Sequence, residues 1–284
     1  MRLVTATHGT NAVFGPIIDG ALYNVAGGRW ACLAKALGED QRAALDVAVA
    51  GAERIDVASL VLLPPVPNPR RILCVGLNYT EHAAESDQGR NAAPSEHPVI
   101  FTRFASSLVG HDAPIVRPLA SSAFDYEGEL AVVIGTTARA VSAANAASVI
   151  GGYSCFMDGT LRDYQRHTSQ FIPGKNFEQS GSFGPWIVTP DEFDHDHAML
   201  TTRVNGEVLQ HTSTSQLIHS IESLIAYCST FTTLEPGDVI ATGTPGGVGY
   251  ARTPPRWLTP GDIVEVEISG IGILANGVVA EQGP

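Results

Sequence analysis

The sequence has few cysteines, and their spacing excludes the sites that cysteines usually build. Four are present, far apart and without a C-x-x-C pair: Cys32, Cys74, Cys155 and Cys228. Neither a zinc knuckle nor a disulfide framework is therefore expected. Isolated cysteines of this kind are typical of a reducing compartment, so we expect a cytoplasmic protein.

Basic residues are scarce as well. The 284 residues include 17 lysines and arginines against 29 aspartates and glutamates, which gives a net charge of −12. Surfaces that bind nucleic acid or anionic membranes need clustered basic side chains, so neither kind of partner is expected. An anionic small-molecule substrate would have to be met by a few well-placed cations.

Long apolar runs and common catalytic signatures are also missing. No apolar run approaches the ~20 residues that a membrane-spanning helix needs, and residues 1–20 do not have the pattern of a signal peptide. The sequence has no G-x-S-x-G, no H-E-x-x-H and no G-x-G-x-x-G after a strand, and Gly174-Lys175-Asn176 is not a phosphate loop. Serine hydrolase, zinc protease and nucleotide-binding functions are therefore not indicated.

What the sequence contains is 44% hydrophobic residues, enough for a full core, in many short strand patterns. Strands are expected at residues 71–75, 99–104, 153–157, 186–188, 201–204, 207–210, 239–241 and 263–268, and helices at 31–50, 142–150 and 215–231. Asn205-Gly206 predicts a hairpin, residues 110–118 a hairpin-like return, and Asn276-Gly277 the end of the pattern. Because helices are few and do not alternate with strands, we expect a mainly β architecture with peripheral helices, of the α+β class.

A proline-rich connector at residues 62–69 divides the chain. Such a segment is stiff and can continue neither a helix nor a central strand. We therefore expect a small N-terminal domain at residues 1–65, which carries no recognisable chemistry, and a main domain at residues 66–284.

The most informative stretch is FDYEGELAVVI, residues 124–134. Side chains of a strand alternate between its faces, so Asp125, Glu127 and Glu129 would share one face, with apolar residues on the other. Like charges side by side destabilise a strand, and a hard divalent cation would neutralise them. The alternative is a solvated strand face on an acidic protein.

A further carboxylate, Asp158, stands at the end of the strand expected at residues 153–157. The segment that follows, DGTLRDYQRH, predicts a short helix with Arg162, Gln165 and Arg166 on one side. Carboxylate oxygens suit Mg²⁺, Mn²⁺ or Ca²⁺ better than zinc.

Five motifs in this order along the chain, from about residue 71 almost to the end, resemble the fumarylacetoacetate hydrolase family. They are Asn78-Tyr79-x-x-His82-x-x-Glu85, Asp125-Tyr126-Glu127-x-Glu129-Leu130, Asp158-Gly159-Thr160-x-Arg162-Asp163-x-Gln165, Lys175-Asn176-Phe177 and Gly237-Asp238-x-x-x-Thr242-Gly243-Thr244-Pro245-x-Gly247-Val248-Gly249. Each motif is weak alone, but all five in the family's order are a specific signal.

The resemblance implies a fumarylacetoacetate hydrolase-like, β-rich fold that assembles as a homodimer. It implies a Mg²⁺ or Mn²⁺ cofactor, with Ca²⁺ as a substitute, held by Glu127, Glu129 and Asp158. It also implies activity on 2,4-diketo acids or related 2-oxo acids. Members include acylpyruvate and fumarylpyruvate hydrolases, oxaloacetate decarboxylases, and decarboxylases or isomerases of hydroxymuconate-type compounds.

The resemblance also implies catalytic roles for His82, Glu85 and Lys175. His82 and Glu85, three residues apart, would lie on one side of a helical turn and activate a water, because a carboxylate raises the basicity of an imidazole. Lys175 would meet the negative charge of the substrate and its enolate. The residues implied to bind the substrate are Arg162, Gln165, Thr244 and Tyr79. The polar residues 86–98 would form a mobile lid.

Each of these residues also has a structural interpretation. His82 could be a solvated loop histidine, and Arg162 could pair with Asp163 or Glu178. The glycine-rich loop at residues 242–249 could simply connect two strands tightly. Residues 194–197, Asp-His-Asp-His, look like metal ligands but are interpreted as solvated surface.

The sequence therefore predicts a divalent-metal-dependent hydrolase that cleaves a carbon–carbon bond of an acylpyruvate- or fumarylpyruvate-type acid through a pyruvate enolate. The alternative is a 2-oxo acid decarboxylase, like those of oxaloacetate, or a hydroxymuconate-type isomerase at the same metal site. A third alternative is a binding module without catalysis, which would need no general base such as His82.

Overall fold

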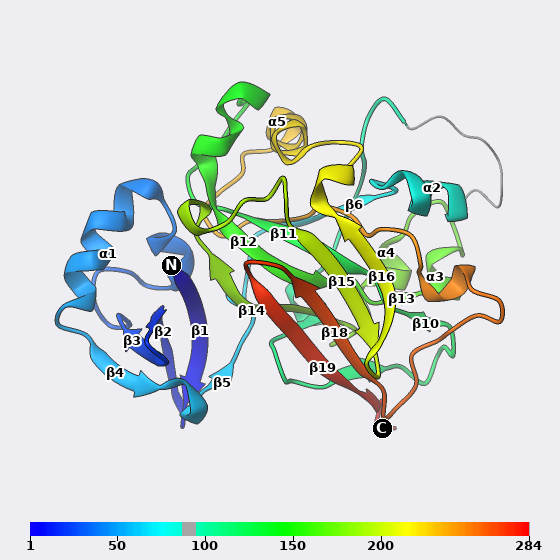
Figure 1. Cartoon of the computed structure of the whole chain (residues 1–284), viewed down its shortest axis with the longest axis horizontal. Helices are drawn as coiled ribbons and strands as arrows, with labels where there is room; N and C mark the ends of the chain where they lie inside the picture. Colours follow the sequence, from blue (N-terminus) through cyan, green and yellow to red (C-terminus); the bar gives the residue numbers. More distant parts are fainter. Residues whose placement is uncertain (87–94, 284) are drawn as a thin grey trace.

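The computed structural model describes residues 1–86 and 95–283, and the chain is mainly β with few helices, as expected (Figure 1). The main sheet has 12 strands within these ranges. In sheet order they are β4 (Glu53–Asp56), β3 (Ala21–Asn24), β2 (Asn11–Ile18), β1 (Arg2–His8), β14 (Gly181–Val188), β12 (Ile150–Met157), β11 (Gly128–Ile134), β17 (Val239–Ala241), β6 (Ile72–Gly76) and β7 (Val99–Thr102), with β5 (Val61–Leu62) beside β1 and β8 (Leu108–Val109) beside β14.

A second sheet packs against the middle of the first, and a short strand pair lies at the end of β11. In the described chain the second sheet runs in the order β16 (Glu207–Ser213), β15 (Met199–Val204), β18 (Ile263–Ile268), β19 (Gly272–Ala280) and β9 (Ile115–Arg117). The short pair is β10 (Phe124–Asp125) with β13 (Thr160–Leu161).

Helices lie at the edges of these sheets (Figure 1). They are α1 (Arg42–Val49), α2 (Thr80–Ser86), α3 (Arg162–Gln165), α4 (Ile172–Lys175) and α5 (Ile221–Phe231). Short 3₁₀ helices occupy Leu33–Ala36, Glu39–Gln41, Val57–Ser59, Ala105–Ser107, Ala143–Val149, Pro190–Glu192, Thr214–Gln216 and Gly249–Ala251. Among the described helices, none is long and apolar enough to cross a bilayer.

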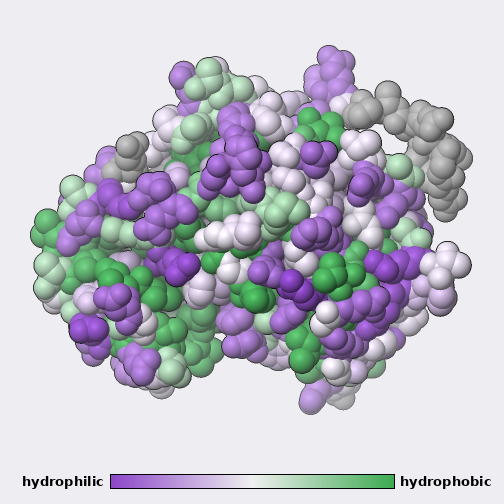
Figure 2. Space-filling view, in the orientation of Figure 1, coloured by the Kyte–Doolittle hydropathy of each residue, from purple (hydrophilic) through white to green (hydrophobic). Residues whose placement is uncertain are grey.

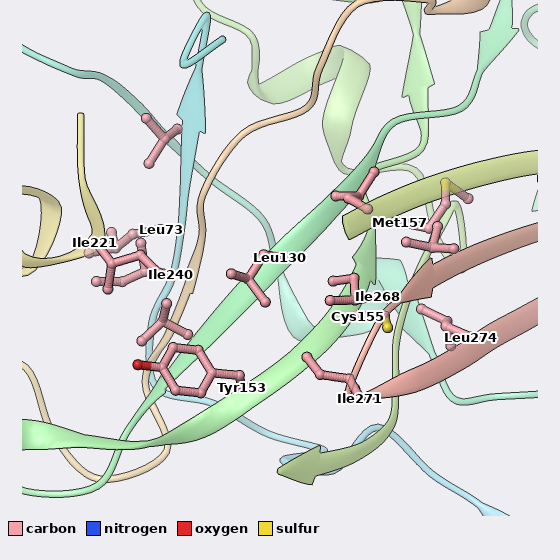
Figure 3. Packing of buried hydrophobic residues seen from close by; sticks show 14 of the residues in the cluster. Leu73, Leu130, Tyr153, Cys155, Met157, Ile221, Ile240, Ile268, Ile271 and Leu274 are labelled. Atoms are coloured by element: carbon pink, nitrogen blue, oxygen red, sulfur yellow. The ribbon is translucent and has the colours of Figure 1, made fainter. Parts of the chain in front are cut away.

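The strand β11 is the centre of the fold, because every one of its residues is buried. Its alternate side chains enter two different cores. Leu130, Val132 and Ile134 pack with the second sheet, whereas Ala131 and Val133 pack toward the N-terminal strands. Figure 3 shows the first of these cores, with Leu130 on β11 and Ile268 and Leu274 on the opposing sheet. A strand covered on both faces needs an almost continuous apolar sequence, which ELAVVI supplies.

Two local predictions are confirmed. Asn205 and Gly206 join β15 to β16 with φ angles of 54° and 81°, the left-handed conformations that a tight hairpin requires. The helix expected at residues 215–231 is α5, the longest of the described helices, and its buried residues face the core. It begins only at Ile221, because the Ser220 hydroxyl accepts from the amide of Ser223 and caps it there.

Other predicted boundaries are wrong. The helix expected at 31–50 is two 3₁₀ turns followed by α1, with Gly38 at the break. The segment 143–149 is a 3₁₀ helix rather than an α-helix. β9, within the return expected at 110–118, pairs in parallel with β19 instead of forming a hairpin. β19 itself continues through Asn276-Gly277 to Ala280. Parallel pairing joins residues more than 150 positions apart, which no local pattern in the sequence can reveal.

The N-terminal residues extend the main sheet. Arg2 and Leu3 of β1 pair with Val188 and Ile187 of β14, so the N-terminal hairpins and the central strands share one hydrogen-bonded sheet. These hairpins and α1 gather on one side of the molecule (Figure 1). Hydrophobic residues are grouped on the surface over the same part, while most of the remaining visible surface is hydrophilic (Figure 2). The division at residue 65 stays a prediction.

Truncation of Leu130 to alanine tests the central position of β11. Leu130 is fully buried between the two sheets, so Leu130→Ala should lower the free energy of unfolding by about 2–5 kcal/mol through lost burial and the cavity left behind. Denaturant unfolding measures this loss. The control is Val208→Ala on β16, because Val208 is 52% exposed and its truncation should change stability by less than about 0.5 kcal/mol. An equal loss of stability for the two substitutions would contradict the central, buried position of β11.

Candidate functional site

A cavity of about 250 Å³ opens where the start of β11 meets α2, α3, α4 and the glycine-rich loop after β17. Its walls include ionisable side chains from β11, from the helices and from the residues beside them. Those that matter for chemistry are His82, Glu127, Glu129, Arg162, Lys175 and Arg166. The cavity therefore brings together residues that lie more than 90 positions apart in the sequence.

Three carboxylates meet at the cavity. One oxygen or more from each of Glu127, Glu129 and Asp158 lies within 4.8 Å of the others, and all three residues are buried. These are the residues that the sequence predicts as metal ligands. Oxygen donors grouped in this way suit a hard divalent cation such as Mg²⁺ or Mn²⁺.

A coordinated break in two neighbouring strands brings the carboxylates together. The stretch 124–134 is not one strand, because Tyr126 and Glu127 separate β10 from β11. The neighbouring strands break opposite these residues, at Asp158-Gly159 between β12 and β13. There the Asp158 amide donates to the Glu127 carbonyl at 2.8 Å. Gly159 is required there, since a Cβ would stand 1.9 Å from the Ser180 carbonyl oxygen.

Buried cations compensate two of the three carboxylates. The Lys175 ammonium lies 2.5 Å from Glu127 and 2.6 Å from Asp158. Arg162 pairs with the other oxygen of Glu127 at 2.6 Å, and Arg103 pairs with the other oxygen of Asp158 at 2.5 Å. Burial alone would raise the pKa of Glu127, but Arg162 and Lys175 lower it to about 2, so this carboxyl group is ionised.

Glu129 lacks such a partner. Its carboxylate accepts a hydrogen bond of 2.9 Å from the amide of Gly243, but in the described chain no lysine, arginine or histidine forms an ion pair with it. Burial, Asp158 and Glu127 together raise the pKa of Glu129 well above its usual value. Without a cation beside it, the buried Glu129 therefore favours its protonated form, and a bound divalent cation would favour the ionised form that can ligate a metal. The three carboxylates therefore fit the metal that the sequence predicts.

Asp125, the third acidic residue of the stretch, is occupied elsewhere. Its two oxygens accept from the amides of Gly249 and Tyr250, at 2.7 and 3.1 Å, and from Nε of Arg162 at 2.7 Å. Asp125 thus holds the glycine-rich loop and orients Arg162 toward Glu127. The alternative pairing of Arg162 with Asp163 or Glu178 is not what the structure contains.

His82 and Glu85 lie together on α2, as expected from their spacing. Nδ1 of His82 is 3.7 Å from a Glu85 oxygen, too long for a hydrogen bond, and neither atom has a hydrogen-bond partner among the described residues. The other Glu85 oxygen accepts from the Gly247 amide at 2.8 Å. His82 is only 5% exposed and lines the cavity, so it is not a solvated loop histidine.

The predicted substrate-binding residues fall into different environments. Gln165 lines the cavity, and its amide oxygen accepts from Arg162 at 3.0 Å. Thr244 also lines it, but its hydroxyl donates to the Gly128 carbonyl and accepts from Gln210, so the hydroxyl is already engaged. The Tyr79 side chain is buried behind the wall, and burial together with the charge of Glu129 raises the pKa of Tyr79.

Two predictions remain outside the site. Residues 87–94, which make up most of the expected lid, lie outside the described residues. The segment 194–197 is only partly solvated, because Nε2 of His195 lies 3.1 Å from Glu222 and Nδ1 lies 3.1 Å from the Tyr153 hydroxyl. His197 and Asp194 pair with each other in solvent.

Sequence reasoning missed Arg103. Its guanidinium is fully buried and, besides Asp158, donates to the Gly159 carbonyl and the Ser107 and Ser180 hydroxyls. A signal existed, since an arginine inside the strand expected at 99–104 would be buried and would need a carboxylate partner. The sequence did not indicate which carboxylate that was, because Asp158 is 55 residues away.

Comparisons with known proteins agree with this geometry. The profile of the family "Fumarylacetoacetate (FAA) hydrolase C-terminal" matches residues 71–279. The mitochondrial oxaloacetate tautomerase FAHD2A of Homo sapiens is 41% identical over 225 residues, which are 78% of this chain and 70% of that protein. The mitochondrial oxaloacetate tautomerase fahd2 of Xenopus laevis is 40% identical over 225 residues, 78% of this chain and 69% of that one.

Solved structures are similar over almost the whole chain. A fumarylacetoacetate hydrolase from Exiguobacterium antarcticum has a TM-score of 0.87 and 38% identity, and covers 99% of this chain and 100% of its own. A maleylpyruvate hydrolase from Sphingobium sp. SYK-6, in complex with manganese(II) ion and pyruvate, has a TM-score of 0.80 and 29% identity with the same coverage.

Removal of the Arg103 guanidinium tests the charge arrangement. Arg103→Ala leaves Asp158 buried without one of its cations, and loss of one partner of a buried pair costs about 3–5 kcal/mol of stability. Thermal or denaturant unfolding of the metal-free protein measures this loss. The matched control is Arg203→Ala, because Arg203 pairs with Glu267 at the surface, where the expected loss is about 0–1 kcal/mol. Similar losses for both variants would refute the compensating role of Arg103.

Proposed function

The chain belongs to the fumarylacetoacetate hydrolase family, and from this premise we propose that it is a divalent-metal-dependent hydrolase of 2,4-diketo acids. The substrate would be of the acylpyruvate or fumarylpyruvate type, cleaved between C3 and C4. The observation that carries the proposal is the position of His82, a buried imidazole that lines the same cavity as Glu127 and Glu129, with Glu85 beside it. Ligand capture alone would need no such base.

Glu127, Glu129 and Asp158 would hold the metal. The lack of a cationic partner for Glu129 among the described residues supports this assignment. When bound, Mg²⁺ or Mn²⁺ would supply positive charge at the 1-carboxylate and 2-oxo oxygens of the substrate, which makes C3 a better leaving carbanion.

Lys175 and Arg162 would orient the substrate and stabilise negative charge. Both cations line the cavity and are buried. Burial alone would lower the pKa of Lys175, but Asp158 and Glu127 outweigh it and raise the pKa, so Lys175 is charged. Fixed positive charge in a water-poor site stabilises a developing enolate far more than water does. Gln165, already held by Arg162, would donate its amide hydrogens to a substrate oxygen.

His82 would move the protons. It takes one from a water molecule, and the resulting hydroxide forms a bond to C4 of the substrate. The C3–C4 bond then breaks, and its electron pair remains on C3 as the enolate of pyruvate, while C4 leaves as a carboxylic acid. The proton on His82 is returned to C3. Glu85 stabilises the imidazolium between these steps, once the 3.7 Å separation shortens to a hydrogen bond.

A second candidate is keto–enol tautomerisation of oxaloacetate, or its decarboxylation. The names of the relatives that are 40 and 41% identical favour tautomerisation. Tautomerisation would pass through the enolate of intact oxaloacetate, with the same cations and a proton carried by His82 between C3 and the 2-oxygen, but with no attacking water and no C–C bond broken. The fold and the carboxylates are compatible with either reaction, so the products have to decide.

Neutralisation of Glu129 tests the metal site. Glu129→Gln keeps the side-chain shape and the acceptor for the Gly243 amide, yet removes one metal ligand charge. Calorimetric titration with Mg²⁺ and Mn²⁺ should show binding weakened by at least about 100-fold, together with loss of turnover. The control is Glu207→Gln, because Glu207 is exposed at the start of β16. This variant should bind metal like the wild type. Full activity of wild-type protein after EDTA treatment and dialysis would sink the proposal.

Replacement of His82 tests the reaction. Wild-type protein with Mg²⁺ should convert acetylpyruvate to equal amounts of pyruvate and acetate, seen as loss of enol absorbance and by enzymatic pyruvate assay. His82→Ala should slow this by about 10²–10⁴-fold with metal affinity retained, whereas His8→Ala, an exposed control, should not. Rapid oxaloacetate enol–keto conversion without any pyruvate from acetylpyruvate would favour the second candidate. Tight binding without turnover of either compound would favour a non-catalytic module.

A further inference from the structure

One cation of the cavity has no part in the chemistry described so far. Arg166 follows α3, is exposed to solvent and lines the same cavity as Glu127 and Glu129. Its backbone amide bonds to the Asp163 carbonyl and closes the short helix. Its side chain forms no ion pair with a carboxylate in residues 1–86 or 95–283.

The other cations of the cavity differ from Arg166 in this respect. Lys175 is held by Glu127 and Asp158, and Arg162 by Asp125 and Glu127. Their charges are offset by the protein. Within the described residues, Arg166 therefore contributes a positive charge to the cavity wall that no protein carboxylate offsets. An anionic group of a substrate can pair with this cation.

The Tyr250 ring holds Arg166 in place. The guanidinium carbon of Arg166 lies 4.7 Å from the centre of the Tyr250 ring, and that of Arg162 lies 4.5 Å from it. The Tyr250 amide donates to Asp125, which also binds Arg162. A cation over an aromatic face is stabilised by the ring and loses side-chain freedom in advance. The two guanidinium groups thus share one aromatic ring, which places Arg166 next to Arg162.

We propose that Arg166, placed by Tyr250, binds a second carboxylate at the far end of the substrate. The inference rests on the proposed function, in which the 2-oxo acid end lies against Glu127, Glu129 and Asp158. Arginine binds carboxylates through two parallel N–H···O bonds, which gives direction as well as affinity. The enzyme then selects dicarboxylic substrates, and Arg166 determines this specificity without touching the reacting atoms.

The simplest competing explanation is a solvated arginine that packs on a tyrosine for stability. The chain offers a matched example, because Arg54 lies 5.4 Å from the ring centre of Tyr23 on the N-terminal strands, far from the cavity in sequence and absent from its lining. Arg54→Ala is therefore the control for loss of an exposed arginine from an aromatic face.

Paired substrates test the proposal. Fumarylpyruvate and acetylpyruvate share the 2,4-diketo acid end and differ in whether the far end carries a carboxylate. Arg166→Ala should lower kcat/KM for fumarylpyruvate by about 10- to 100-fold, mainly through KM, and leave acetylpyruvate unchanged. For Arg166→Lys, kcat/KM for fumarylpyruvate should lie between the wild-type and Arg166→Ala values, and Arg166→Glu should lower it further than Arg166→Ala does. Arg54→Ala should change neither substrate. An equal loss for both substrates, or no loss for either, would overturn the proposal.

A binding measurement separates this inference from the proposed reaction. Calorimetry of Mg²⁺-loaded His82→Ala and His82→Ala/Arg166→Ala with both compounds requires no turnover. Adding Arg166→Ala to the His82→Ala variant should weaken the binding of fumarylpyruvate by about 10- to 100-fold and should leave the binding of acetylpyruvate unchanged. If wild-type protein turns over neither compound, the hydrolase proposal fails while this result still stands. Equal weakening of both compounds, or no weakening of fumarylpyruvate, overturns the role of Arg166.

Discussion

Mutual compensation of buried charge is the constraint on which this site depends. Four carboxylates, those of Asp125, Glu127, Glu129 and Asp158, are removed from water next to one another. Each buried ion loses several kcal/mol of hydration unless a partner offsets it. Arg103, Arg162 and Lys175 are buried with them and pair with three of the four. Glu129 has no cationic partner among the described residues, which leaves its carboxyl group open to the divalent cation that we propose.

The fold supplies these pairings through the central strands. β11 and β12 are neighbours in the main sheet, so Glu129 on β11 and Asp158 just after β12 lie on adjacent strands. Both strands break at this point, and Glu127 lies in the break before β11. Arg103 arrives from beyond β7, Arg162 from α3 and Lys175 from α4. The Gly243 amide reaches Glu129 because Gly243 adopts a φ of 106° and lies against Asn78, where a side chain would not fit.

The same arrangement explains how one scaffold can serve related reactions. The relatives of this chain carry the names of tautomerases and hydrolases, and both reactions pass through an enolate. In the proposed reaction the buried cations would stabilise the enolate, His82 on α2 would carry the proton, and Arg166, which follows α3, would bind the far carboxylate. Substrate choice can therefore vary on one side of the cavity while the charge arrangement on the other is retained.

Much of this protein follows from local sequence. Period-two alternation and turn residues predict the β-rich class and the Asn205-Gly206 hairpin, because strand geometry and turn conformation are properties of neighbouring residues. Alternation places Asp125 beside Glu127 and Glu129, whereas the family resemblance implies Asp158 as the third metal ligand. The spacing of His82 and Glu85 likewise determines that they share a helix face. Tertiary structure alone decided that the acidic stretch is two strands, that Asp125 holds a loop and that Arg103 pairs with Asp158. It also decided that Arg166 pairs with no carboxylate among the residues that the structure describes. Whether a charge is compensated depends on which distant chain lies beside it, and burial makes that pairing a matter of several kcal/mol.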